Sequence, residues 1–195
     1  MKHLLTITAI LSLTSSMVLQ AEPAATQQQF FTQLSALCGK AFAGTVVVDN
    51  QPSAAFSGPM LMHVRDCSDN EIQIPFVVGD NHSRTWIISK TRSGLRLKHQ
   101  HKHQDGSDDV STMYGGDTLD AGWAQAQSFP ADAYSKDLFI RTRTPQSVGN
   151  TWHLYLYPEE RFSYRLTREG REFRVDFDLT RPVALPAPAW GFEKR

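Results

Sequence analysis

The stretch that decides the fold is Phe162-Ser-Tyr-Arg-Leu-Thr-Arg-Glu-Gly-Arg-Glu-Phe-Arg-Val-Asp-Phe-Asp-Leu179. Apolar residues alternate with polar ones on both sides of Glu169-Gly170, which is a typical turn sequence. Successive side chains of a strand point to opposite faces, so each half of this stretch has one apolar face and one polar face. The pattern predicts an antiparallel hairpin with one face on a core and the other in water.

Similar short runs fill most of the chain and are separated by turn residues. Strands are predicted over 42–48, 60–65, 71–78, 85–90, 95–103, 110–114, 123–129, 138–142, 151–157, 162–166 and 173–179. A helix is predicted over 27–38, because Thr26 and Gln29 form a capping box and Gly39 stands where a helix usually ends. The stretch 130–137 has room for one or two helical turns. This order predicts an all-β protein, an antiparallel β-barrel or a barrel-like sandwich with a short N-terminal helix.

The composition limits the kinds of partner. The 195 residues include 20 basic and 20 acidic side chains, so the formal net charge is zero. A balanced charge argues against electrostatic binding of nucleic acid. After position 30 there is no run of eighteen apolar residues, so we expect no membrane span.

The first 21 residues have the pattern of a secretory signal peptide. A short basic start, Met1-Lys-His3, precedes an apolar run over 4–13, and Ala21 offers a small residue for cleavage. The expected location is therefore periplasmic or secreted. Residues 22–181 are predicted to form a single domain, and the proline-containing tail over 182–195 is predicted to be extended.

The two cysteines, Cys38 and Cys67, are predicted to form a disulfide. An even number of cysteines in an exported chain favours pairing, because that compartment is oxidising. A thiol or metal pair is the alternative, but the Cys-x-x-Cys spacing typical of such sites is absent.

The most informative segment for function is Leu95-Arg-Leu-Lys-His-Gln-His-Lys-His-Gln-Asp-Gly106. Residues two apart share a face of a strand, so His99, His101 and His103 are expected to extend the apolar face of Leu95 and Leu97. In a closed barrel this face points inward. Imidazoles with ordinary pKa values would then titrate near neutral pH.

Three interpretations of the histidines stay open. They form a solvated strand end, they line a polar pocket for a small molecule together with Tyr114, or they bind zinc or copper. Tyr114 is expected opposite His99 across a hairpin. Because a straight strand does not wrap around a metal, a further ligand would be needed from His63, His153, Asp105 or Asp108.

The chain contains none of the common catalytic motifs, such as Gly-x-Ser-x-Gly, His-Glu-x-x-His or a phosphate-binding loop. We therefore leave open whether the protein is an enzyme and slightly favour a binding protein. The function predicted is an exported small-ligand-binding β-barrel with a histidine-lined pocket. The alternatives are a metal-binding protein or metal-dependent hydrolase that uses the same histidines, and a structural protein of the cell envelope without a pocket. The oligomeric state does not follow from the sequence.

Two resemblances rest on these residues. The segment 97–106, with Tyr114-Gly-Gly116 and Phe129-Pro-Ala-Asp132, resembles a family of exported bacterial proteins of unknown function that share His-x-His-x-His-x-Asp-Gly and Tyr-Gly-Gly segments. That resemblance implies export but no activity. The order of one helix and then antiparallel strands is also similar to lipocalin-like barrels, which bind small, mostly apolar molecules. The Gly-x-Trp motif of lipocalins is replaced by the sequence that starts at Gly39-Lys-Ala.

Overall fold

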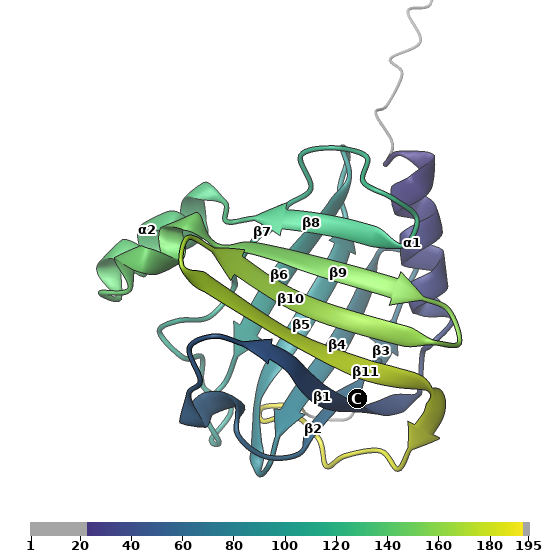
Figure 1. Ribbon diagram of the computed structural model, residues 1–195, viewed down its shortest axis with the longest axis horizontal. Coiled ribbons are helices and arrows are strands. Elements are labelled where there is room, and N and C mark those ends of the chain that lie inside the picture. Colours follow the sequence, from purple (N-terminus) through teal and green to yellow (C-terminus); the bar gives the residue numbers. More distant parts are fainter. Residues whose placement is uncertain (1–22, 193–195) are drawn as a thin grey trace, which may run out of the picture.

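A computed structural model describes residues 23–192, so the predicted signal peptide lies outside the described residues. These residues form a nearly closed antiparallel β-barrel of ten strands preceded by a short helix (Figure 1). The predicted fold class is thereby confirmed. Within residues 23–192, no helix is both long and apolar enough to cross a bilayer.

The barrel consists of two meanders that meet where the first and last strands pair. The first meander runs in the spatial order β7-β6-β5-β4-β2-β1 and the second in the order β11-β10-β9-β8, with β1 beside β11. The strands are β1 (Ala41–Asp49), β2 (Met60–His63), β4 (Glu71–Val78), β5 (Asn81–Lys90), β6 (Leu95–His101), β7 (Tyr114–Asp117), β8 (Ala126–Pro130), β9 (Thr151–Tyr157), β10 (Arg161–Arg168) and β11 (Arg171–Val183). The short strand β3 (Asp66–Cys67) pairs with β4 outside this path. Two single-turn 3-10 helices, η1 (Ala54–Phe56) and η2 (Pro145–Gly149), lie in the connections.

The predicted C-terminal hairpin is present as β10 and β11. Phe162 faces Phe177, and Tyr164 faces Val175 across the pair. All four of these side chains are buried, whereas Asp178 on the other face is exposed. The alternation therefore places one face of the hairpin in the core, as expected.

The N-terminal helix is confirmed, but it starts two residues and ends three residues earlier than predicted. Helix α1 spans Ala25–Ser35, and the capping interaction comes from Gln27, whose Oε1 accepts from the Ala24 amide at 2.9 Å. The hydroxyl of Thr26 donates instead to the carbonyl of Ala121. Phe30 and Leu34 join the barrel core, and α1 lies against the strand ends of β8 and β9 (Figure 1).

Two predicted strands are wrong. Residues 138–142 belong almost entirely to helix α2 (Ala133–Arg141), whose N-cap is Asp132. The segment 110–114 is mainly a loop, and the strand that pairs with β6 starts at Tyr114 and contains Gly115 and Gly116. Two consecutive glycines do not favour a strand by propensity, so the reason for this strand lies in tertiary contacts.

Those contacts close the barrel between β7 and β8. The amide of Asp132 donates to the Gly115 carbonyl at 2.9 Å. The Ser135 hydroxyl accepts from the Gly115 amide at 2.7 Å and donates to its carbonyl at 2.9 Å. We call this junction the seam. It joins the sheet edges through backbone groups and one serine of α2, since no ladder between β7 and β8 is present in the described residues.

Asp132 holds α2 at the seam by two interactions. Its carboxylate accepts from the Ser135 amide at 2.8 Å and from Lys98 Nζ at 2.5 Å. We expect Asp132→Ala to lower the free energy of unfolding by about 1 to 2 kcal/mol, because it removes the helix cap and leaves Lys98 unpaired. Urea denaturation checks this value, with Asp137→Ala as control. Asp137 forms an exposed pair with Arg141, so its loss should cost less than about 0.5 kcal/mol. Equal losses for the two variants would contradict this role of Asp132.

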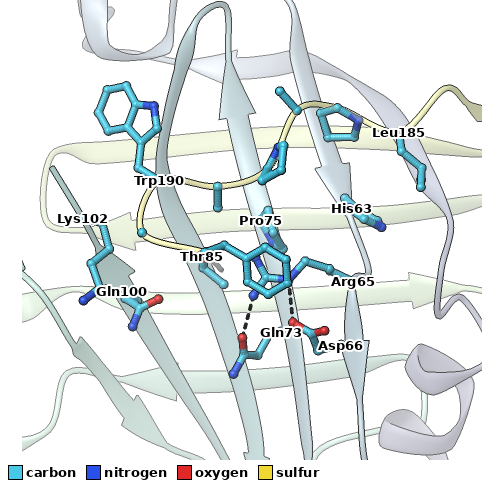
Figure 2. Close-up of a pocket in the computed structure, with 16 residues that line it drawn as sticks. His63, Arg65, Asp66, Gln73, Pro75, Thr85, Gln100, Lys102, Leu185 and Trp190 are labelled. Atoms are coloured by element: carbon cyan, nitrogen blue, oxygen red, sulfur yellow. Dashed lines mark hydrogen bonds and ion pairs between the residues drawn. The ribbon is translucent and has the colours of Figure 1, made fainter. Parts of the chain in front are cut away.

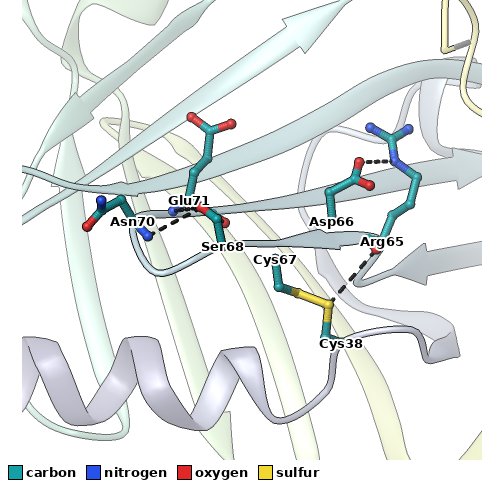
Figure 3. The surroundings of a disulfide bond; sticks show 7 residues. All are labelled: Cys38, Arg65, Asp66, Cys67, Ser68, Asn70 and Glu71. Carbon is teal, nitrogen blue, oxygen red and sulfur yellow. Dashed lines mark hydrogen bonds and ion pairs between the residues drawn. A yellow bond between two sulfur atoms is a disulfide. The ribbon is translucent and has the colours of Figure 1, made fainter. Parts of the chain in front are cut away.

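The predicted disulfide between Cys38 and Cys67 is present (Figure 3). It joins the turn after α1 to strand β3, and the two Cα atoms lie 6.2 Å apart. The bond closes a loop of about 30 residues, for which the chain-entropy estimate is roughly 3 to 4 kcal/mol. The helix is thus tied covalently to the first meander.

Candidate functional site

The structure brings three of the four predicted site residues together inside one end of the barrel. His99 and His101 lie on β6, and Tyr114 on β7 pairs directly with His99. The Tyr114 ring stacks on His99 with centroids 4.5 Å apart and lies 5.4 Å from the His101 ring. These side chains form one aromatic and polar cluster at the end of β6.

His99 is fully engaged within the core. Its Nδ1 lies 3.2 Å from the Tyr114 carbonyl, which only accepts, so Nδ1 carries the proton. Its Nε2 then accepts from the Tyr164 hydroxyl at 2.9 Å. Burial, the charge of His101 and that of Lys98 lower the pKa of His99 to about 3, although the Tyr114 carbonyl opposes this. His99 is therefore a neutral packing residue whose two nitrogens are both in use.

His101 is only partly buried and has free hydrogen-bonding capacity. Its Nε2 lies 3.1 Å from the Tyr114 hydroxyl, and its Nδ1 has no hydrogen-bond partner within residues 23–192. Burial and the Arg84 guanidinium lower its pKa to about 4. The expectation that these imidazoles titrate near neutral pH is thus wrong for His99 and His101, because the sequence did not reveal their burial.

Arg84 is the residue of this cluster that the sequence analysis missed. It pairs with His101 across β5 and β6 and shares the inward face of β5 with Trp86 and Ile88. The guanidinium carbon lies 5.4 Å from the ring centroid of Phe56. The signal was available, since position 84 is two residues before Trp86, but the predicted strand began at residue 85.

His103 does not join the cluster. Strand β6 ends at His101, two residues earlier than predicted, and His103 lies in the following turn. Its side chain is 56% exposed, and its Nε2 lies 3.8 Å from Asp109. The inward histidine face therefore consists of His99 and His101.

The other candidate metal ligands are dispersed. His153 bonds to Ser128 and Thr167 on the outer surface. Asp108 forms an ion pair with Lys102, and the carboxylate of Asp105 accepts a hydrogen bond from the Ser107 amide. In the described part of the chain, no group of three or more histidine, cysteine or acidic side chains has the arrangement of a metal site. Zinc or copper binding stays a prediction from the sequence.

A large cleft lies elsewhere, on the outer face of the sheet. After β11 the chain turns back as an extended segment, residues 185–192, which we call the strap (Figure 1). The Trp190 amide donates to the His82 carbonyl at 3.0 Å, and His82 Nδ1 donates to the Ala187 carbonyl at 3.1 Å. The Phe192 ring lies 3.6 Å from the guanidinium carbon of Arg65. These contacts hold the strap across the barrel wall.

The strap and the wall enclose a cleft of about 1080 Å³ (Figure 2). Its floor consists of side chains from β2 to β6, among them His63, Gln73, Thr85 and Gln100, and of Lys102 just after β6. The volume is in the range of cavities that hold small molecules. The sequence analysis missed this cleft, because nothing in the sequence of the tail shows where it returns to the sheet.

The charged side chains in the cleft form ion pairs, although Arg65 Nη1 is buried without a hydrogen-bond partner in the described residues. Arg65 contacts Asp66 at 2.5 Å and donates to Gln73 at 2.7 Å. Lys102 pairs with Asp108 at 2.8 Å. The cleft thus has little net charge available for a ligand.

Apart from Arg65 Nη1, the hydrogen-bonding groups without a partner in the cleft are neutral. The amide of Gln100, the hydroxyl of Thr85 and the ring of His63 have no side-chain hydrogen bond within residues 23–192. Burial, and then the neighbouring Arg65 charge, lower the pKa of His63 and so favour the neutral imidazole. A neutral polar molecule matches these groups better than an ion.

The chain matches no protein-family model, no curated protein and no solved structure. The resemblances drawn from the histidine segment and from the order of elements therefore stay predictions.

Proposed function

We propose that the protein binds a small, neutral, hydroxyl-rich molecule of the saccharide class in the cleft under the strap. The observation that carries this proposal is a cleft of about 1080 Å³ whose charged side chains form ion pairs and whose neutral polar groups without a partner are the amide of Gln100, the hydroxyl of Thr85 and the imidazole of His63. Such groups both donate and accept, as sugar hydroxyls do. The barrel fold is compatible with a ligand-binding protein.

The apolar part of the lining supports the same class. Phe192, Pro75 and Pro186 contribute apolar surface beside the polar floor. A pyranose ring has a face of C–H groups and a rim of hydroxyls, so it uses both kinds of surface. A fatty acid would leave Gln100 and Thr85 unpaired on binding, which is unfavourable.

The test is titration calorimetry with maltotriose, cellotriose and triacetylchitotriose as probes. We expect one of these trisaccharides to bind, and Gln100→Ala to weaken its binding about three- to tenfold, the effect of one lost hydrogen bond. Gln125→Ala is the matched control, because Gln125 is an exposed amide that does not line the cleft. No binding of any probe, or equal effects of the two variants, would contradict the proposal.

Export to the periplasm or the medium is part of this proposal and rests on the predicted signal peptide. A disulfide between Cys38 and Cys67 supports it, because stable disulfides are typical of oxidising compartments. A zinc- or copper-dependent activity of His99 and His101 would require the Tyr164 hydroxyl to leave His99 Nε2, so we rank it second.

A further inference from the structure

The end of the barrel opposite α1 contains a cation without a counterion. Arg84 enters this end from β5, beside its strand partner His101. Its Nη2 lies 3.5 Å from the Ala55 carbonyl, a long contact, and its Nη1 is buried with no partner in the described residues. Among the ion pairs of residues 23–192, none includes Arg84. Arg84 is half-buried as a whole, but a buried guanidinium nitrogen such as its Nη1 normally requires an acceptor.

His101 provides a further donor for the same acceptor. The Tyr114 hydroxyl lies 3.1 Å from His101 Nε2. If that hydroxyl donates to Nε2, the neutral ring has its proton on Nδ1, which is free to donate to a ligand. The nearest carboxylate that acts on His101 is Asp109, which accepts from the Ser111 amide at 2.6 Å and lies 3.8 Å from His103. The cluster therefore offers donors and lacks a strong acceptor.

The positive charge of Arg84 favours an anion over a metal ion as the ligand. A metal ion at His101 would lie next to the Arg84 guanidinium and would be repelled by it. An anion is attracted by the same guanidinium, and its oxygens accept from Arg84 and His101. Phe56 of η1 packs over Arg84 and against Phe173, and so covers one side of the guanidinium.

We propose that Arg84 and His101 form a binding site for a small anion of the carboxylate class at this end of the barrel, in which the Tyr114 hydroxyl fixes the tautomer of His101. The site is separate from the cleft under the strap, since none of the three residues lines that cleft. Carboxylate and inorganic anions share the chemistry of the site, and the experiment distinguishes them.

The experiment measures the melting temperature with increasing sodium acetate, chloride or phosphate at constant ionic strength. Binding to the folded state raises the melting temperature by about 3 to 5 °C for each tenfold rise in anion above its Kd. We expect acetate to give this rise in the wild type and Arg84→Gln to abolish it. Arg92→Gln is the matched control, because Arg92 is an exposed arginine at the end of the same strand pair. It should respond like the wild type.

A second variant keeps the test decisive if Arg84→Gln does not fold. Tyr114→Phe removes only the hydroxyl, and it should reduce the acetate response while the Arg92→Gln response stays. Three results would overturn the proposal: no anion response in the wild type, an equal response in Arg84→Gln, or a response to chloride and phosphate but not to acetate. Stabilisation by added zinc that disappears in His101→Gln would also overturn it, in favour of a metal site.

Discussion

Gly116→Ala is expected to lower the free energy of unfolding by about 4 kcal/mol or more, or to prevent folding. A Cβ atom at position 116 would lie 1.8 Å from the carbonyl oxygen of Pro130 and 2.9 Å from its carbonyl carbon. Both partners are backbone atoms, so no side-chain rotation relieves the clash. The seam between β7 and β8 would have to separate, which would break the contacts of Gly115 with Asp132 and Ser135.

Urea denaturation of the purified variants measures this effect. Gly149→Ala is the control, because the nearest atom to its added Cβ is 4.0 Å away and its φ is not in the left-handed region. We expect a change within about 0.5 kcal/mol for this variant. Similar midpoints for Gly116→Ala and Gly149→Ala would show that the seam tolerates a side chain.

The second large effect is a loss of stability in mild acid. The pKa of His99 is lowered to about 3 and that of His101 to about 4, mainly by burial. In the unfolded chain both residues have a pKa of about 6.5, so the unfolded state binds more protons below that pH. The contribution of the two histidines to the free energy of unfolding is complete above about pH 6.5. It is lost as the pH falls towards their pKa values in the folded protein.

Between pH 7 and pH 5 the expected loss is roughly 2 kcal/mol for each histidine and roughly 4 kcal/mol for both. Chemical denaturation at a series of pH values measures how the free energy of unfolding depends on pH. His101→Gln should reduce this loss by roughly 2 kcal/mol, because it removes one of the two histidines whose pKa is lowered most. A free energy of unfolding that is constant from pH 7 to pH 5 would contradict the burial of these rings.

The sequence predicted the parts of the fold that follow from local pattern. The alternation over Phe162 to Leu179 defined the hairpin and its buried face, and it needed no information from distant residues. The structural role of Gly115 and Gly116, in contrast, could not be predicted from the local sequence pattern. Their role became visible only when Pro130 and Asp132 were placed beside them, because close approach of two backbones leaves no periodic signal.

The candidate sites also combine features that the sequence spacing predicts with features that depend on distant contacts. Period-two spacing placed His99 and His101 on one face and Tyr114 opposite His99. The end of β6 at His101 depends on the bridge from Lys102 to Asp108, which spacing alone does not reveal. The strap and its cleft depend on the contact of His82 with Ala187, which lies 105 positions later in the chain. The local sequence pattern does not reveal such a contact.

The pairing of β1 with β11 sets an order for the assembly of the chain. Each meander is built from neighbours in the sequence, whereas the junction of β1 and β11 joins segments about 130 residues apart. Contacts of such long range form slowly, because a large loop must close first. The disulfide lies wholly within the first half, so oxidation can secure that half while the second is still unfolded. The barrel then closes last along the β1–β11 ladder, because the seam joins segments no more than about 20 residues apart and does not involve β11. A chain that emerges from a ribosome or a membrane pore cannot complete that ladder before its final strand is free.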